Sequence, residues 1–283
     1  MAISDHIEMM VGPLYLEQLS DSDLELLASA ADPRDDIRRD PTRLEALIDN
    51  PVTFRQLFSV PGRDPLLRGT PFLIFAVLIH RVVRDLGQAT FVEEWVGPRQ
   101  RVPVFDTASL KDFGADPMRR FFLVQLLASY TNVASGSMLV KTRRGWRRRR
   151  FSELDPMRLI ELAELVPAPE RPSVYRRLGD LSLFLTGIFP DYAAERLGAE
   201  RRGLERALGA ADREQSEGRD GIWILEQLGR RAYRIAQQGA DHRAAMAGVL
   251  AEVSENFAAA RRVLNFLTDR YLYPTRRQWF GAD

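Results

Sequence analysis

The sequence has no cysteine and only three histidines in 283 residues. The missing cysteines exclude disulfides, thiolate nucleophiles and cysteine-ligated zinc, and they suit a reducing compartment. His6, His80 and His242 are far apart and show no metal-ligand spacing such as HExxH. We therefore expect neither a metal site nor a cofactor.

Targeting and membrane segments are also missing from the sequence pattern. The start, Met-Ala-Ile-Ser-Asp-His, has no basic stretch followed by a long apolar one, unlike a secretory signal. The longest apolar run, residues 71–79, is much too short to cross a bilayer. We expect a cytoplasmic protein that does not contact a membrane.

Recognisable catalytic motifs are missing as well. The chain contains no Walker motif, no GxGxxG and no GxSxG. Ser135-Gly136-Ser137 resembles the inner part of a nucleophile elbow, but it precedes a strand pattern and is better interpreted as a turn. We predict no catalytic residue, and an enzyme without a readable motif ranks last among the functional hypotheses.

Helical patterns dominate what is present. Hydrophobic residues make up 45% and charged residues 28% of the chain, as in folded globular proteins. Pairs such as Thr70-Pro71, Asp116-Pro117 and Asp155-Pro156 are typical helix starts. The fold class we predict is mainly α, a multi-helix globular core. Its expected helices span about 24–31, 43–48, 52–59, 70–86, 106–113, 117–133, 157–166, 173–188, 192–213, 222–238 and 242–271. Helix 70–86 should be the most buried of them, because its first half is apolar on every face.

Two segments favour β-hairpins over helices. Residues 90–105 and 137–151 each contain two short strand patterns around a glycine-containing turn. An isolated two-stranded ribbon is only marginally stable, so the two hairpins are candidates to pair as one small sheet across helix 117–133.

The expected domain division places a helical core with both hairpins in residues 1–197. Residues 198–221 are rich in Gly, Arg, Glu and Asp, which indicates a linker or a solvated helix. Residues 222–283 should form a C-terminal helical hairpin, in which the apolar stripes of two amphipathic helices pack together. This hairpin could pack on the core as one domain.

The strongest functional signal is the basic segment Lys141–Arg150, in which seven of ten residues are cationic although the whole chain has a net charge of only +1. A local field of this kind needs an anionic partner. Arginine binds phosphate through bidentate, charge-assisted hydrogen bonds, and a tryptophan among arginines can stack on a base. The predicted nucleic-acid or polyanion-binding residues are Lys141, Arg143, Arg144, Trp146, Arg147, Arg148, Arg149 and Arg150.

Other interpretations compete with this one. The arginines could protect an exposed edge strand, or they could pair with residues 1–50, which hold twelve Asp or Glu against four Arg. A winged helix is a sharper alternative, with 117–133 as recognition helix and 137–151 as wing. Against it, the apolar run 121–127 leaves helix 117–133 little polar surface, which favours a core helix.

Two non-enzymatic functions therefore lead. The first is a binding or regulatory protein whose basic hairpin engages nucleic acid or another polyanion, an acidic protein included. The second is a protein–protein scaffold or regulatory subunit that does not bind nucleic acid. It would offer the C-terminal helices and the acidic N-terminal region to a protein partner.

Overall fold

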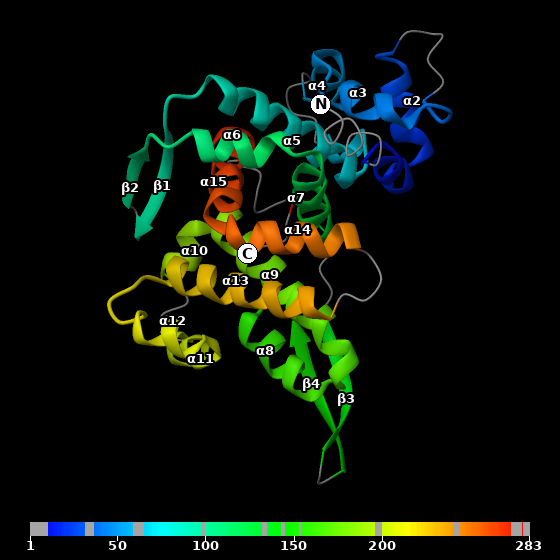
Figure 1. Cartoon of the computed structure of the whole chain (residues 1–283). Coiled ribbons are helices and arrows are strands. Elements are labelled where there is room, and N and C mark those ends of the chain that lie inside the picture. Colours follow the sequence, from blue (N-terminus) through cyan, green and yellow to red (C-terminus); the bar gives the residue numbers. More distant parts are fainter. Residues whose placement is uncertain are drawn as a thin grey trace. The chain divides into compact units, whose positions relative to one another are not determined.

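The mainly helical fold class is confirmed by the structure, a computed structural model (Figure 1). It describes residues 11–31, 37–58, 65–97, 100–131, 135–142, 145–152, 154–195, 200–239, 244–272 and 279. In these ranges no helix is both long enough and apolar enough to pass through a bilayer. The chain divides into two compact units, each of which is built from two separate stretches of sequence.

The first unit comprises residues 1–90 and 107–131. Its described elements are a helical stretch at 11–18, α2 (Asp21–Ala28), α3 (Leu44–Ile48), α4 (Pro51–Phe58), α5 (Pro71–Gln88), α6 (Ala108–Ala115) and α7 (Pro117–Ser129). Helix α5 starts where the sequence indicated, because the Thr70 side chain accepts a hydrogen bond from the Leu73 N–H and Pro71 occupies the first turn. Every residue from Phe72 to His80 is buried.

Helix α7 packs against α5 and belongs to the same core. Phe121, Phe122 and Leu127 are each at most 2% exposed, so α7 is a buried core helix and cannot serve as the recognition helix of a winged-helix fold. These buried side chains belong to the apolar run 121–127, which gives the helix little polar surface.

The second unit comprises residues 91–106 and 132–283. Its strands are β1 (Val92–Gly97), β2 (Gln100–Val104), β3 (Ser135–Thr142) and β4 (Gly145–Ser152). Its main helices are α8 (Pro156–Leu165), α9 (Arg171–Ile188), α10 (Pro190–Glu195), α11 (Arg201–Ala207), α12 (Ala210–Glu214), α13 (Gly221–Gln238), α14 (Ala244–Glu255) and α15 (Phe257–Leu267).

Helix α9 is the centre of the second unit, and α8, α13 and α15 pack around it. All residues from Leu178 to Ile188 are buried. The hydroxyl side chains of this run bond within the helix: Ser182 Oγ donates to the Leu178 carbonyl at 2.8 Å, and Thr186 Oγ1 donates to the Ser182 carbonyl at 2.7 Å. These bonds let the hydroxyl groups enter the core without an unpaired donor.

The expectation that the two strand pairs join into one sheet is wrong. Strands β1 and β2 form one antiparallel two-stranded sheet, and β3 and β4 form another. Each pair has its own helical neighbours in the second unit: β1 lies against α15 and α10, and β4 lies against α8. Packing against helices thus replaces the sheet pairing that seemed necessary for stability.

Two helices that the sequence indicated as continuous are interrupted. In place of one helix over 242–271, α14 ends at Glu255 and α15 begins at Phe257. Arg230 of α13 donates to the carbonyls of Ser254 and Glu255 at 3.2 and 2.9 Å, which satisfies acceptors at the helix end. The segment expected as a helix over 192–213 contains α10, α11 and α12 as separate short helices.

The region expected as a linker or solvated helix, 198–221, belongs to the second unit and contains α11 and α12. Most of its described residues are exposed or half-buried, but Leu204 and Leu208 are buried. The domain division at 198–221 stays a prediction.

Candidate functional site

The predicted basic hairpin lies on β3 and β4, which pair in an antiparallel register from Ser135↔Ser152 to Thr142↔Gly145. For these strands the structure describes the backbone, and Arg143 and Arg144 lie outside the described residues. The register pairs Lys141 with Trp146, Val140 with Arg147, Leu139 with Arg148, Met138 with Arg149, and Ser137 with Arg150. Because successive strand residues alternate between faces, Lys141, Trp146, Arg148 and Arg150 share one face, and Arg147 and Arg149 share the other.

Among the described strands, this ribbon is a separate two-stranded sheet. Neither β3 nor β4 pairs with a third strand there, so both are edge strands. Strand β4 lies beside α8, and Figure 1 shows the ribbon continuing past the end of that helix. Five of the seven predicted cationic residues, Lys141 and Arg147–Arg150, are thus brought together on one two-stranded element.

Four acidic residues of the N-terminal region have partners within the first unit. Asp21 pairs with Arg38, and Asp49 pairs with Arg84. Glu45 accepts a hydrogen bond from Arg120 at 2.9 Å. Asp23 accepts from the Thr70 N–H at 2.9 Å and from the Thr70 hydroxyl at 2.7 Å. Four of the acids that could have neutralised the basic hairpin therefore already bind other groups.

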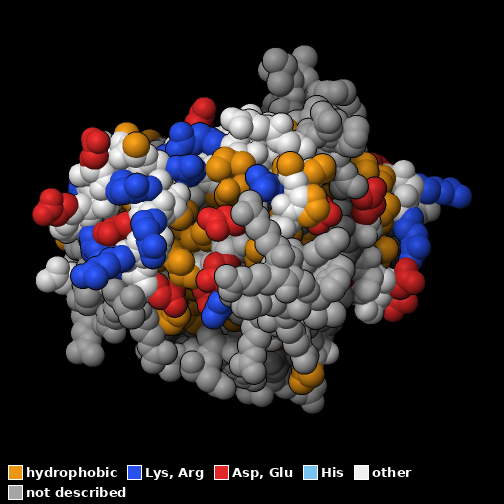
Figure 2. All heavy atoms as spheres, turned by 90° about the horizontal axis from the view of Figure 1, so that it is seen from below, with side chains coloured by type: hydrophobic (Ala, Val, Ile, Leu, Met, Phe, Trp, Pro, Cys, Tyr) orange, Lys and Arg blue, Asp and Glu red, His pale blue; other side chains and the backbone are white. Residues whose placement is uncertain are grey.

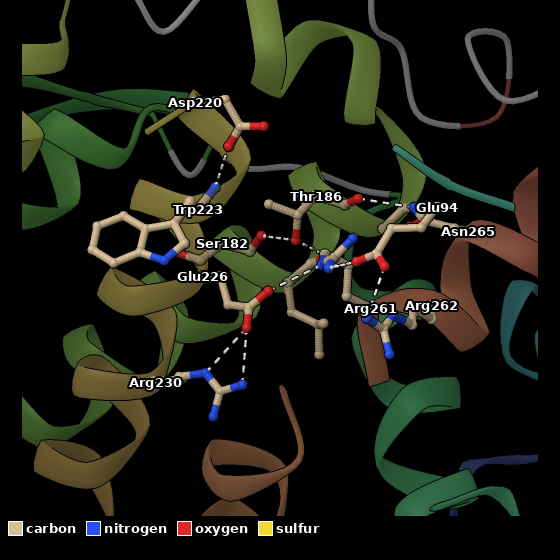
Figure 3. Close-up of polar contacts among 12 residues, drawn as sticks. Glu94, Ser182, Thr186, Asp220, Trp223, Glu226, Arg230, Arg261, Arg262 and Asn265 are labelled. Atoms are coloured by element: carbon tan, nitrogen blue, oxygen red, sulfur yellow. Dashed lines mark hydrogen bonds and ion pairs between the residues drawn. The ribbon is translucent and has the colours of Figure 1, made fainter. Parts of the chain in front are cut away.

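A second group of charged residues, which sequence reasoning missed, lies buried in the second unit (Figure 3). Arg261 of α15 is 6% exposed in its side chain, and its Nε donates to Glu226 of α13 at 3.1 Å. Its Nη2 contacts Glu94 of β1, and Arg262 donates to the other oxygen of Glu94 at 2.7 Å. Arg230 donates to Glu226 at 2.8 Å. Three arginines and two carboxylates thus form one network.

This network is suited to holding structure rather than to acid–base chemistry. Burial opposes the ionisation of Glu94, but the hydrogen bonds and charges of Arg262 and Arg261 outweigh it and hold the pKa of Glu94 below its ordinary value. Glu94 therefore stays a carboxylate at neutral pH, with both oxygens bound to guanidinium groups. The arrangement fixes β1 to α15, and Arg101 of β2 pairs with Asp269, just after α15, at 3.1 Å.

A third polar group surrounds His80 in the first unit. The Tyr15 hydroxyl lies 3.4 Å from His80 Nε2, and Glu45 Oε1 lies 3.7 Å from the same nitrogen. Burial, followed by the charges of Arg120 and Arg84, lowers the pKa of His80 to about 3. Burial also raises the pKa of Tyr15. Both groups stay neutral near pH 7, and Tyr15 is fully buried, so this cluster stabilises the core and is not accessible to a substrate.

On the face shown in Figure 2, the described surface carries charges of both signs. There, Lys and Arg side chains lie among Asp and Glu side chains rather than in a field of one sign. Such mixed surfaces are typical of solvated protein faces and do not attract a polyanion strongly.

Comparison with known proteins identifies no relative of this chain. No family model matches the chain, and neither a curated protein nor a solved structure matches it. The functional argument therefore has to start from the residues and their geometry.

Proposed function

We propose that this protein binds nucleic acid through the arginines of the β3–β4 ribbon. The observation that carries the proposal is the run Arg147–Arg150 on one strand of a two-stranded ribbon, in a chain whose net charge is only +1. Four successive arginines on a strand distribute cations to both faces of the ribbon. A segment with charge on both faces binds anions more readily than it packs in a core.

The shape of the ribbon supports the same partner. The major groove of B-DNA accepts a two-stranded β-ribbon, and the phosphates on both sides of the groove are within reach of long arginine side chains. Trp146 lies at the Gly145 end of β4, opposite Lys141, where it can stack on an unpaired base. Direct base reading is not part of the proposal, because phosphate contacts alone account for the arginine content.

The main alternatives receive less support from the described residues. One alternative is that the N-terminal acids neutralise the ribbon arginines. This hypothesis has less support because Asp21, Asp23, Glu45 and Asp49 have partners in their own unit. The scaffold hypothesis relied on the C-terminal helices as well as on the acidic N-terminal region. Their apolar residues Leu225, Leu228, Val253 and Phe257 are at most 2% exposed and pack inside the second unit.

The proposal is tested by measuring binding to duplex DNA and to single-stranded RNA as a function of salt. The test variant replaces Arg147, Arg148, Arg149 and Arg150 with Ser. The matched control replaces four exposed arginines elsewhere, Arg55, Arg202, Arg206 and Arg234, and so removes the same charge. We expect the test variant to bind much more weakly and to lose roughly 0.9 from the slope of log K against log salt for each duplex phosphate contact removed.

The outcomes separate the competing explanations. If the control variant loses as much affinity as the test variant, net charge is responsible and the ribbon is not the site. If the wild type binds neither nucleic acid at low salt, the proposal fails and the arginines protect an edge strand. If the test variant unfolds, as judged by circular dichroism, the arginines are structural partners of another part of the chain.

A further inference from the structure

A small pocket opens among four helices of the second unit, away from the residues assigned above. It is bounded by α8, α9, α11 and α13 and has a volume of about 180 Å³. For comparison, a protein cavity of about 150 Å³ accommodates benzene. The pocket therefore has room for one small ring or one short branched alkyl group.

The floor of this pocket is apolar. Leu178 of α9 and Leu228 and Ala232 of α13 line it, and each is at most 2% exposed. Ile160 of α8 and Ala207 of α11 complete the apolar part of the lining. These side chains favour the hydrocarbon part of a ligand over water.

The rim carries polar groups that have no partners among the described residues. Arg231, Glu164 and Tyr175 line the pocket, and none of their side chains makes a hydrogen bond or an ion pair with a described residue. Arg206 also lines it; among the described residues its side chain makes one hydrogen bond, from Nε to the Arg202 carbonyl at 3.2 Å, and neither terminal nitrogen has a partner there.

The contrast with neighbouring arginines makes Arg231 notable. Arg230, one residue earlier on α13, binds Glu226 and two carbonyls. Arg201 and Arg213 on the adjoining short helices likewise bind a carboxylate or backbone carbonyls. Arg231 is half-buried at the pocket and has no such role, although burying part of a guanidinium without a partner costs free energy.

From these observations we propose that the pocket binds a small organic carboxylate. The apolar group lies on Leu178, Leu228 and Ala232, and the carboxylate binds Arg231, with Arg206 beside it. Two arginines against one glutamate give the rim a net positive charge, which selects an anion over a cation. This inference does not depend on nucleic-acid binding by the β3–β4 ribbon.

Benzoate is a suitable probe, with benzamide and benzylamine as neutral and cationic analogues of nearly the same shape. Calorimetric titration of the full-length protein should give a Kd on the order of 1 mM for benzoate, and at least about tenfold weaker binding for both analogues. Arg231→Met should lose at least about tenfold in affinity for benzoate. Arg234→Met changes an exposed arginine on the same helix that does not line the pocket, and it should stay within about twofold of the wild type.

Two further measurements keep the test decisive if Arg231→Met does not fold. Ala207→Leu should fill the pocket from the α11 side and abolish binding, and benzoate should shift the methyl resonances of Leu178 and Leu228 in the wild type. The proposal is overturned if benzoate does not saturate in the millimolar range, or if benzamide binds equally well. It is also overturned if benzylamine binds more tightly, because Glu164 would then determine the ligand, or if Arg231→Met binds benzoate like the wild type.

Discussion

At the scale of single residues, His80 shows how burial decides the protonation state of a side chain. An ion pair with Glu45 would be possible if His80 were protonated, since the two atoms lie 3.7 Å apart. Arg120 already binds Glu45 at 2.9 Å, however, and burial together with Arg120 and Arg84 lowers the pKa of His80 to about 3. The histidine is therefore a neutral core residue that contacts Tyr15.

This pKa makes the stability of the protein depend on pH with a definite sign. The unfolded state takes up a proton at His80 below about pH 6.5, whereas the folded state does not do so until about pH 3, so stability falls as the pH is lowered. We expect the wild type to lose about 2 kcal/mol between pH 7.5 and 5 through this residue. His80→Gln should remove that part of the loss. Urea unfolding of both proteins at the two pH values measures it, and parallel losses would show that His80 is not responsible.

Glu94 and its neighbour Glu93 give a matched test of the buried network. The side chain of Glu94 is 12% exposed, and that of Glu93 is 53% exposed. Glu94→Gln removes the carboxylate that pairs with Arg262 and one of the two that pair with Arg261, and it should destabilise the protein by about 3 kcal/mol. Glu93→Gln should cost less than about 1 kcal/mol. Chemical denaturation at pH 7 measures both. Equal effects would contradict the structural role of the network.

The same network predicts a pH dependence of its own. The pKa of Glu94 is lowered in the folded state, so its contribution is complete above the ordinary glutamate pKa and is lost as the pH falls through the folded-state value. The difference in stability between wild type and Glu94→Gln should therefore shrink in acid. A difference that stays constant down to pH 3 would show that the carboxylate charge is not what matters.

Sequence patterns reveal such residues only in part. Glu226 and Arg230 are four residues apart on one helix, which is a recognisable pairing pattern. Arg261 reaches Glu94 across 167 positions of sequence, and no local pattern indicates that contact. The hairpin arginines were conspicuous because they are consecutive, whereas the pocket at Arg231 depends on four helices that come together only in the fold.

At the scale of elements, the two central helices differ in how far their burial could be predicted from the sequence. Helix α5 is apolar through Phe72–Ile79, so its burial could be predicted from composition. Helix α9 is buried equally continuously over Leu178–Ile188, but Asp180, Ser182 and Thr186 interrupt its apolar pattern. Their hydrogen bonds, such as that from the Tyr233 hydroxyl to Asp180 at 2.9 Å, compensate the polar groups within the core.

Close packing of α9 against α13 and α15 also depends on glycines. A Cβ on Gly229 would lie 2.5 Å from the Phe257 ring and 2.9 Å from Ser182 Cβ, too near for either to stay in place. Gly229→Ala should therefore destabilise the protein by about 1–3 kcal/mol. Gly248 of α14 has no atom within 4 Å of the same position, and Gly248→Ala should stabilise the protein by about 0.4–1 kcal/mol. Thermal unfolding should give shifts of opposite sign, and two shifts of the same sign would contradict this packing.

At the scale of the whole molecule, the chain crosses between its two compact units three times, at 90/91, 106/107 and 131/132. Composition drew attention to 198–221, where glycine and charge are concentrated, because sequence methods locate boundaries by loss of apolar pattern. The crossing points near Thr90, Asp106 and Thr131 have no such signal. Each crossing point lies where the chain leaves the core of one unit and joins the core of the other. Which core a helix joins depends on its contacts with distant parts of the chain.

The discontinuous first unit leads to a final prediction about fragments. Helix α5 is buried along Phe72–His80, and α7, with Phe121 and Phe122, is one of the helices that cover it. A fragment of residues 1–90 would expose that apolar surface, so we expect it to aggregate or to show no cooperative thermal transition. A fragment of residues 1–131 restores α6 and α7 and should unfold cooperatively, with Phe121→Ala in this longer fragment abolishing or strongly lowering the transition. Circular dichroism melts of the three proteins provide the comparison. Cooperative unfolding of 1–90 alone would mean that α7 is dispensable for the first unit.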